Sequence, residues 1–138
     1  MINIKHKRAI EVLYSLAKQS TCTDGHVAAM IMNPEFTVVY ATGVNGGTKR
    51  TPCLCNLGDK YTCVHAEINA LMDSKQLNFH RIPAIMLCTK APCVSCAGAI
   101  INAGISAVYF CEKYKYTAGI KLLLDNSVAV YALNYLTK

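Results

Sequence analysis

CVHAEINA at residues 63–70 and PCVSC at residues 92–96 decide how this sequence folds and which metal ligands it offers. The first stretch supplies an imidazole, His65, and a carboxylate, Glu67, and the second supplies the thiols of Cys93 and Cys96. A structural zinc site has four protein ligands, whereas one imidazole and two thiolates leave the fourth position to water, as in catalytic zinc sites. The two stretches therefore predict a catalytic zinc site with ligands His65, Cys93 and Cys96. Glu67 is then the unligated general acid and base.

The pattern around both stretches brings these side chains together. Apolar residues recur at helical intervals over residues 64–72, which predicts a helix that begins at about His65 and holds Glu67 in its first turn. Pro92 marks the start of a second helix, on which the two cysteines, three residues apart, share one face. Two helix starts would then meet at one metal ion.

Each stretch alone has a simpler interpretation. A His-x-Glu pair is common on helices, and a single Cys-x-x-Cys fits a redox pair or half of a structural zinc site. The order of the two stretches, the proline and the two predicted helix starts together favour the catalytic zinc site.

Length and composition indicate one globular domain. A chain of 138 residues is large enough for one core, and we expect residues 1–138 to form it. Hydrophobic residues make up 53% of the chain and the mean hydropathy is +0.26, which indicates that other subunits cover part of the surface. No apolar run approaches the ~20 residues of a membrane span. The basic start also lacks the features of a secretion signal, so we expect a cytoplasmic protein, or one in the host cytoplasm if a phage encodes it.

The eight cysteines fit either a disulfide scaffold or thiols and metal ligands in a reducing compartment. Cys88 and Cys111 lie in or beside apolar segments, which favours the second interpretation.

The net charge of +6 is spread over several short segments rather than along a stripe with interleaved aromatic residues. This distribution disfavours nucleic acid as a partner. Two small basic groups, Lys49 with Arg50 and Lys113 with Lys115, fit a single phosphate better than a polyanion.

Periodicity along the chain predicts an α/β fold. A helix over residues 9–17 precedes two strands, 27–32 and 36–41, which a short turn joins into an antiparallel hairpin. Residues 42–62 are rich in turn formers and predict a long functional loop. The later elements are predicted as strands 84–88, 106–110 and 128–133 and helices 93–104 and 118–124. Their alternation predicts parallel pairing, and hence a three-layer α/β/α fold with a five-stranded mixed sheet between helices.

Several segments resemble the zinc-dependent cytidine and deoxycytidylate deaminase superfamily, and its deoxycytidylate (dCMP) deaminase branch in particular. They are LAKQSTC at 16–22, GVNG at 43–46, HAEINAL at 65–71, PCVSC at 92–96, IINAGI at 100–105, and Tyr114. The resemblance covers nearly the whole chain, which is similar in length to the compact phage and bacterial members. It implies a cytidine-deaminase-like fold and hydrolysis of dCMP to dUMP and ammonia, which feeds thymidylate synthesis.

The resemblance also implies roles for residues around the zinc. A bound zinc makes its water more acidic, and Glu67 takes the proton and returns protons to N3 and the leaving amine as C4 is attacked. Ala66 is small where the base must approach, and its N–H can donate to the base carbonyl. Asn45 resembles the family asparagine that hydrogen-bonds the sugar, although a turn asparagine also tolerates positive φ. Tyr114 lies where the family places an aromatic residue on the nucleotide, and simple packing explains it equally well.

A second metal site has some support in the sequence. Cys22, Cys53, Cys55 and Cys63 could hold a structural zinc, as some members of the branch do. The Cys-x-Cys spacing of residues 53 and 55 is tighter than a usual Cys-x-x-Cys knuckle and favours free or partly buried thiols, so we do not count these residues among the zinc ligands.

Members of the branch are commonly hexamers that dCTP or dTTP regulates together with Mg²⁺. The resemblance therefore implies a homo-oligomer, and the loop over residues 43–50 is where such an effector would bind.

The sequence departs from the family where a phosphate is expected. Asp24-Gly25 replaces two usual arginines, and Tyr116 replaces a common aspartate. A monophosphate must then find positive charge elsewhere, and Lys113 and Lys115 are candidates, unless they are ordinary solvated charges. We predict a small pyrimidine deoxynucleotide as substrate, with dCMP preferred over deoxycytidine.

Two alternatives stay open from the sequence. One is a nucleoside or nucleic-acid base deaminase on the same fold, and the other is a zinc-stabilised binding module without catalysis.

Overall fold

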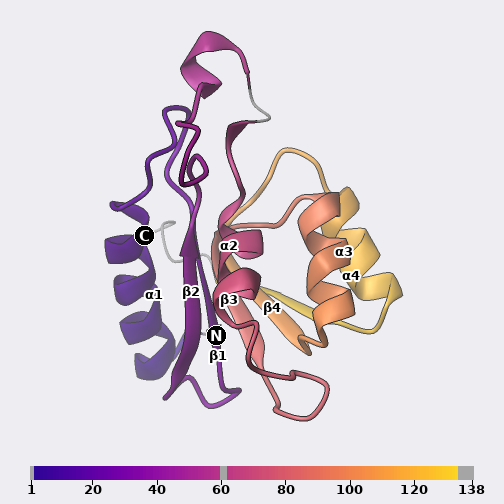
Figure 1. Ribbon diagram of the computed structural model, residues 1–138. Helices are drawn as coiled ribbons and strands as arrows, with labels where there is room; N and C mark the ends of the chain where they lie inside the picture. Colours follow the sequence, from indigo (N-terminus) through magenta and orange to yellow (C-terminus); the bar gives the residue numbers. More distant parts are fainter. Residues whose placement is uncertain (1, 60–61, 134–138) are drawn as a thin grey trace.

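A five-stranded mixed sheet organises the chain in the computed structural model, which describes residues 2–59 and 62–133 (Figure 1). The strands are β1 (Ala28–Met32), β2 (Val39–Val44), β3 (Ile85–Lys90), β4 (Ala107–Glu112) and β5 (Ala129–Ala132). The helices are α1 (Ile4–Ala17), α2 (Ala66–Asp73), α3 (Val94–Ala103) and α4 (Ala118–Asp125), with a 3-10 turn, η1 (Cys55–Leu57), in the long loop. The strand order is β2-β1-β3-β4-β5.

Strand directions follow the connections. A short connection joins β1 to β2 and leaves them antiparallel, and β1 is also antiparallel to β3. Helical crossovers join β3 to β4 and β4 to β5, and both pairs are parallel. The predicted hairpin and the predicted parallel pairing of the later strands are both confirmed.

Helices cover both faces of the sheet, with α1 on one face and α2, α3 and α4 on the other (Figure 1). Side chains of β1 alternate between two cores, as the period of a strand requires. Met30 belongs to the core beneath α1, and its neighbour Ile31 belongs to the core on the opposite face. The three-layer α/β/α prediction is therefore confirmed.

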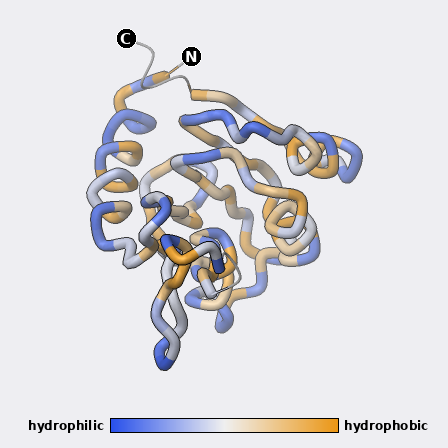
Figure 2. The backbone as a smooth tube through the Cα atoms, turned by 90° about the horizontal axis from the view of Figure 1, so that it is seen from above, coloured by the Kyte–Doolittle hydropathy of each residue, from blue (hydrophilic) through white to orange (hydrophobic). Residues whose placement is uncertain are grey.

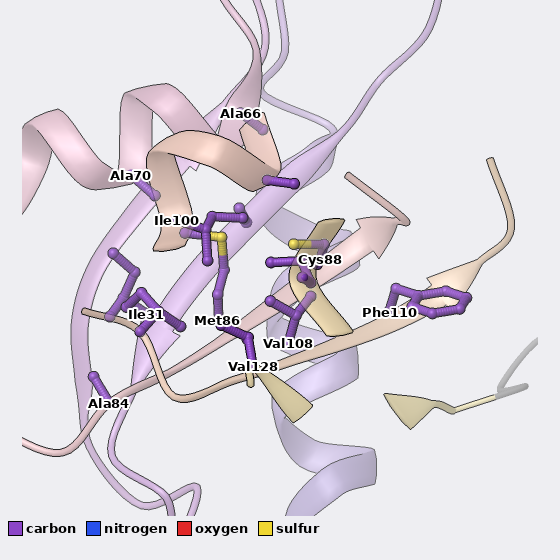
Figure 3. Packing of buried hydrophobic residues seen from close by; sticks show 14 of the residues in the cluster. Ile31, Ala66, Ala70, Ala84, Met86, Cys88, Ile100, Val108, Phe110 and Val128 are labelled. Atoms are coloured by element: carbon purple, nitrogen blue, oxygen red, sulfur yellow. The ribbon is translucent and has the colours of Figure 1, made fainter. Parts of the chain in front are cut away.

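Both cores consist of apolar side chains from the strands and the inner faces of the helices. On the side of α2 and α3, Met86 and Cys88 of β3 pack with Val108 of β4 and Ile100 of α3 (Figure 3). On the other side, hydrophobic and hydrophilic residues alternate along the turns of α1, so that one stripe of this helix faces the sheet (Figure 2). The Cys88 thiol is fully buried in this packing, in line with its predicted place in an apolar strand.

The second strand begins later than the sequence predicts. The prediction placed it at 36–41, but β2 spans Val39–Val44 because the turn is longer than Asn33-Pro34-Glu35. The side-chain oxygen of Asn33 accepts hydrogen bonds from the backbone N–H groups of Thr37 and Val38. Phe36 adopts φ 60° and turns into the core, so it ends the turn rather than beginning a strand. The later start carries the strand to Val44, directly before Asn45.

Other boundaries differ by smaller amounts. The first helix begins at Ile4 rather than residue 9, because the side chain of Asn3 accepts a hydrogen bond from the N–H of His6 and caps a polar first turn. Within residues 2–59 and 62–133, no helix has the length and apolar character needed to cross a membrane.

Candidate active site

The three predicted zinc ligands lie at the starts of two helices. His65 is the N-terminal cap residue of α2 and Cys93 is that of α3, and both have extended backbone. Cys96 follows in the first turn of α3 and is buried. Residues at helix caps project beyond the helix end, so the side chains of the two helices meet there.

Two glycines let neighbouring elements approach these helix starts. A Cβ atom added to Gly43 of β2 would lie 2.3 Å from the carbonyl oxygen of Ala66 in α2. A Cβ atom added to Gly119 of α4 would lie 2.2 Å from the carbonyl oxygen of Pro92, directly before Cys93. Both neighbours are backbone atoms, which a rotation of a side chain cannot move away. The absence of a side chain at these positions therefore contributes to placing His65 and Cys93.

The ligand atoms lie at distances that fit one zinc ion. The Nδ1 atom of His65 lies 3.3 Å from the Sγ atom of Cys96 and 3.5 Å from that of Cys93. All three ligand atoms lie within 4.8 Å of one another. Tetrahedral zinc with Zn–N of ~2.1 Å and Zn–S of ~2.3 Å separates its nitrogen and sulfur ligands by about 3.6 Å. The donor set and its spacing therefore fit zinc and leave room for a fourth ligand.

Glu67 lies beside this cluster with its carboxyl group inside the protein. The residue is 4% exposed, in the first turn of α2. Burial raises the pKa of the carboxyl group above its ordinary value. Burial likewise raises the pKa of the Cys96 thiol, which therefore needs a cation nearby to bind as a thiolate. A buried carboxyl group with a raised pKa next to a cation site is an arrangement suited to proton transfer near neutral pH.

A pocket of about 310 Å³ connects the cluster with the solvent. His65, Glu67 and Cys93 form part of its wall, and so do Asn45, Ala66 and Tyr114. The structure thus brings the sequence candidates to one cavity, with three exceptions: Cys96, which is buried, and the exposed Lys113 and Lys115. Ala66 is fully buried, and its small side chain takes up little of the pocket that it lines together with Glu67.

The side chain of Asn45 holds two loops together. Its Oδ1 atom accepts a hydrogen bond from the N–H of Val27 at 2.9 Å and lies within hydrogen-bond distance of the Ser20 hydroxyl. Its Nδ2 atom donates to the carbonyl oxygen of Gly25 at 2.8 Å. Asn45 is therefore a loop-positioning residue on the wall of the pocket, and one N–H of its amide remains for a ligand.

Lys113 and Lys115 are both exposed and are not part of the pocket wall, whereas Tyr114 between them is. Lys115 lies over the ring of Tyr116, with its Nζ atom 5.0 Å from the ring centre. Lys90, at the end of β3, does line the pocket, and its Nζ atom lies 5.9 Å from the ring centre of Tyr114. Sequence reasoning missed Lys90. Its place at the carboxyl end of a predicted parallel strand, just before the PCVSC stretch, is the signal that could have found it.

Four further cysteines form a second cluster, and three of them line the pocket. Cys22, Cys53, Cys55 and Cys63 have sulfur atoms within 4.8 Å of one another. The backbone N–H groups of Cys55 and Thr23 lower the pKa of the Cys53 thiol. The sequence favours free thiols only through the Cys-x-Cys spacing of residues 53 and 55. The spatial arrangement of the four sulfur atoms favours the alternative, a shared metal site.

The fold and the site define a zinc-binding α/β/α domain with a buried carboxyl group at the metal. The chain belongs to the cytidine and deoxycytidylate deaminase family, whose zinc-binding region matches residues 3–112. The family predicted from the sequence is thereby confirmed.

Two relatives support the same family assignment. ComE operon protein 2 of Bacillus subtilis is 32% identical over 104 residues, which are 72% of this chain and 55% of that protein. Deoxycytidylate deaminase of Saccharomyces cerevisiae is 32% identical over 132 residues, which are 86% of this chain and 41% of that enzyme. The chain thus spans about half the length, or less, of these two relatives.

A solved structure matches over nearly the full length of both chains. The dCMP deaminase of cyanophage S-TIM5 in complex with dCMP and dUMP is 27% identical, with a TM-score of 0.82, and the match covers 96% of this chain and 100% of that one. A deaminase/reductase of Thermotoga maritima, 18% identical with a TM-score of 0.70, shares the fold.

Proposed function

We propose that this protein is an enzyme that hydrolyses dCMP to dUMP and ammonia. The observation that carries this proposal is the buried carboxyl group of Glu67 beside the His65, Cys93 and Cys96 cluster, on the wall of one pocket. The likeness to the cyanophage enzyme, solved with dCMP and dUMP, supports the choice of substrate.

The chain's own residues supply ligands, a proton carrier and space for the base. His65, Cys93 and Cys96 would hold zinc, which when bound makes a water molecule more acidic and polarises it for attack on the pyrimidine ring. Glu67 accepts a proton at its carboxylate and delivers protons to N3 and the departing amine of the base. Because its pKa is raised by burial, the carboxyl group can hold the proton between these transfers.

Substrate contacts come from the rest of the pocket wall. Ala66 would leave room for the base, and we expect its backbone N–H to donate to the base carbonyl, as the family resemblance implies. Asn45 has one free amide N–H for the sugar, and Tyr114 offers a ring face to the nucleotide. Among the basic residues, Lys90 lines the pocket and is our first candidate for the phosphate, with Lys113 and Lys115 as further contacts from the exposed loop.

Ammonia release measured across five substrates tests the proposal: cytidine, deoxycytidine, CMP, dCMP and single-stranded DNA. We expect the highest kcat/KM for dCMP. Equal kcat/KM for dCMP and deoxycytidine would contradict the nucleotide assignment and place the protein with nucleoside deaminases. Turnover of DNA would indicate a nucleic-acid base deaminase, and absence of turnover on all five, with zinc bound, would indicate a binding module.

We also propose a cytoplasmic homo-oligomer, a hexamer by resemblance. The loop over residues 43–50 is the proposed site of an allosteric dCTP or dTTP with Mg²⁺. The exposed Lys49 and Arg50 support this position, because they offer positive charge to a triphosphate.

A further inference from the structure

Thr89 is a buried polar residue at the point where β3 separates from β1. The register of these antiparallel strands ends at Ala29 opposite Cys88, whereas β3 continues in register with β4 as far as Lys90. In open α/β sheets, ligands commonly bind in the crevice that forms at the carboxyl ends of strands whose neighbours part. Thr89 therefore lies where the sheet opens toward the active-site pocket.

The hydroxyl of Thr89 takes the place of the next backbone pair between the two strands. Its Oγ1 atom accepts a hydrogen bond from the N–H of Ala28 at 3.1 Å and donates to the carbonyl oxygen of Ala28 at 3.5 Å. In a regular antiparallel pair, the two backbones exchange both of these bonds. Thr89 is 2% exposed, so losing its hydroxyl would leave the buried N–H of Ala28 without this partner.

The two segments that this hydroxyl joins both contribute to the wall of the active-site pocket. Val27, directly before Ala28, lines the pocket, and so does Lys90, directly after Thr89 and three residues before Cys93. Thr89 is not itself on the pocket wall. Its hydroxyl therefore acts between two parts of the wall and not on a ligand.

The position of Asn45 depends on the start of β1. The backbone N–H of Asn45 donates to the carbonyl oxygen of Val27 at 3.1 Å, and its Oδ1 atom accepts from the N–H of Val27 at 2.9 Å. These two hydrogen bonds fix Asn45 against Val27, which is bonded covalently to Ala28. A shift of Ala28 away from Thr89 would therefore move Asn45 as well.

We propose that Thr89 is a positioning residue for Asn45. Its hydroxyl holds the start of β1, which carries Asn45, at a fixed distance from the end of β3, which leads to the zinc ligand Cys93. The consequence for substrate binding rests on the proposed deaminase function, whereas the position of Asn45 does not.

Replacing the hydroxyl with a methyl group tests the proposal at nearly constant shape. Thr89→Val should leave the zinc content unchanged and raise KM for dCMP about tenfold, the effect of one lost hydrogen bond at the substrate. The change in kcat should be smaller, because Glu67 and the zinc ligands keep their places. Thr89→Ser keeps the hydroxyl and should restore the KM of the unmodified protein. A KM in Thr89→Ser as high as in Thr89→Val would overturn the role of the hydroxyl.

Ser106 provides a matched control for general loss of stability. Its hydroxyl also joins neighbouring strands, since it donates to the carbonyl oxygen of Ala84 at 3.0 Å. These two residues directly precede β4 and β3, at the opposite end of the sheet from the pocket. Ser106→Ala should lower the free energy of unfolding without raising KM. The same rise in KM for Ser106→Ala as for Thr89→Val would contradict the positioning role.

A double-mutant cycle tests whether Thr89 acts through Asn45. Thr89→Val should raise KM in the unmodified background and have little further effect in Asn45→Ala, because the side chain that it positions is then absent. If the two increases multiply, Thr89 does not act through Asn45 and the proposal is wrong. Should Thr89→Val not fold, Thr89→Cys takes its place in the same cycle, since a thiol is only a weak hydrogen-bond partner.

Hydrogen exchange separates this proposal from the proposed function, because it requires no substrate. In Thr89→Val, the N–H groups of Val27, Ala28 and Asn45 should exchange faster than in the unmodified protein, in Thr89→Ser and in Ser106→Ala. Unchanged exchange would overturn the proposal whatever the substrate is. Faster exchange without any turnover of dCMP by the unmodified protein would overturn the proposed function and leave the positioning of Asn45 by Thr89 standing.

Discussion

Glu67 is an ionisable residue that is only 4% exposed and yet borders a pocket, a combination that is rare for a glutamate. Within residues 2–59 and 62–133, no lysine or arginine forms an ion pair with this carboxyl group. Its environment therefore favours the protonated form, as the direction of its pKa indicates.

We predict that Glu67→Gln keeps zinc but loses turnover by a factor of ~10² or more, because the amide has nearly the same shape and cannot transfer protons. Zinc analysis and ammonia release on dCMP measure both parts. Loss of zinc in this variant would make Glu67 a metal ligand, and unchanged turnover would remove it from the mechanism.

Lys90 lines the pocket near Tyr114, whereas Lys113 and Lys115 are exposed beside it. We predict that Lys90→Ala raises KM for dCMP about tenfold to a hundredfold, the effect of one charge-assisted contact of roughly 1.5–3 kcal/mol. Turnover of deoxycytidine, which has no phosphate, is the control and should change little.

The double variant Lys113→Ala/Lys115→Ala distinguishes the two positions for the phosphate. If KM for dCMP rises in that variant and stays unchanged in Lys90→Ala, the phosphate lies at the exposed loop, as the sequence predicts.

The metal cluster at His65, Cys93 and Cys96 could be predicted because each residue is tied to a local signal, a helix start or a proline. Lys90 was missed, and the four cysteines were named together only as the alternative that the sequence did not favour. Lys90 is one lysine at a strand end, without a periodic pattern. Spacing arguments compare neighbours such as Cys53 and Cys55, but the cluster is completed by Cys22, which only the folded chain brings near.

Gly43 sets how closely α2 approaches β2. A Cβ atom there would lie 2.3 Å from the carbonyl oxygen of Ala66 and 2.3 Å from the backbone nitrogen of Ala70, so the helix must move as a whole. Because α2 carries both His65 and Glu67 at its start, the shift would reach the metal cluster.

We predict that Gly43→Ala lowers the free energy of unfolding by about 1–3 kcal/mol, the usual cost of overpacking, and weakens zinc binding at His65. Gly98→Ala in α3 is the matched control, because a Cβ atom there meets nothing within 4 Å. It should raise stability by roughly 0.5–1 kcal/mol through helix propensity. Denaturant unfolding and zinc analysis of both variants measure the difference, and equal stabilities would contradict this account of the packing.

Periodicity predicted the helices and strands themselves more accurately than it predicted their first and last residues. The strands and helices around the sheet were predicted in the right order, since buried faces repeat at fixed intervals. The start of β2 was misplaced because the side chain of Asn33 accepts hydrogen bonds from the backbone N–H groups of Thr37 and Val38. Periodicity in the sequence does not indicate such a contact. That residues 1–138 form one domain stays a prediction.

At the scale of the whole molecule, a polar contact joins the first helix to the end of β4. The Tyr14 hydroxyl of α1 donates to the Glu112 carboxylate at the end of β4 at 2.6 Å. Burial and this acceptor raise the pKa of Tyr14, so the phenol stays protonated and keeps its donor. This contact fixes α1 against the parallel strands, and with it the Ser20 loop that reaches Asn45.

Large apolar side chains remain on the outside of the described structure. Ile4 and Val12 of α1, Val39 of β2 and Met72 of α2 are 45–63% exposed. β2 is also an edge strand of the sheet, with backbone groups open to pairing. These exposed apolar residues, together with the high mean hydropathy of the chain, +0.26, are expected of a surface that other copies of the chain cover.

We predict that the protein elutes as an oligomer, with a mass near six times that of the 15.0 kDa chain when size-exclusion chromatography is coupled to light scattering at micromolar concentration. Val39→Lys places a charge on the edge strand, where a neighbouring strand or subunit would bury it at a cost of several kcal/mol. If the edge of β2 is part of the interface, this variant should shift to smaller species and keep its zinc. A single species of 15.0 kDa in the unmodified protein would contradict the oligomer, and an unchanged mass in Val39→Lys would move the interface away from β2 to the exposed faces of α1 and α2.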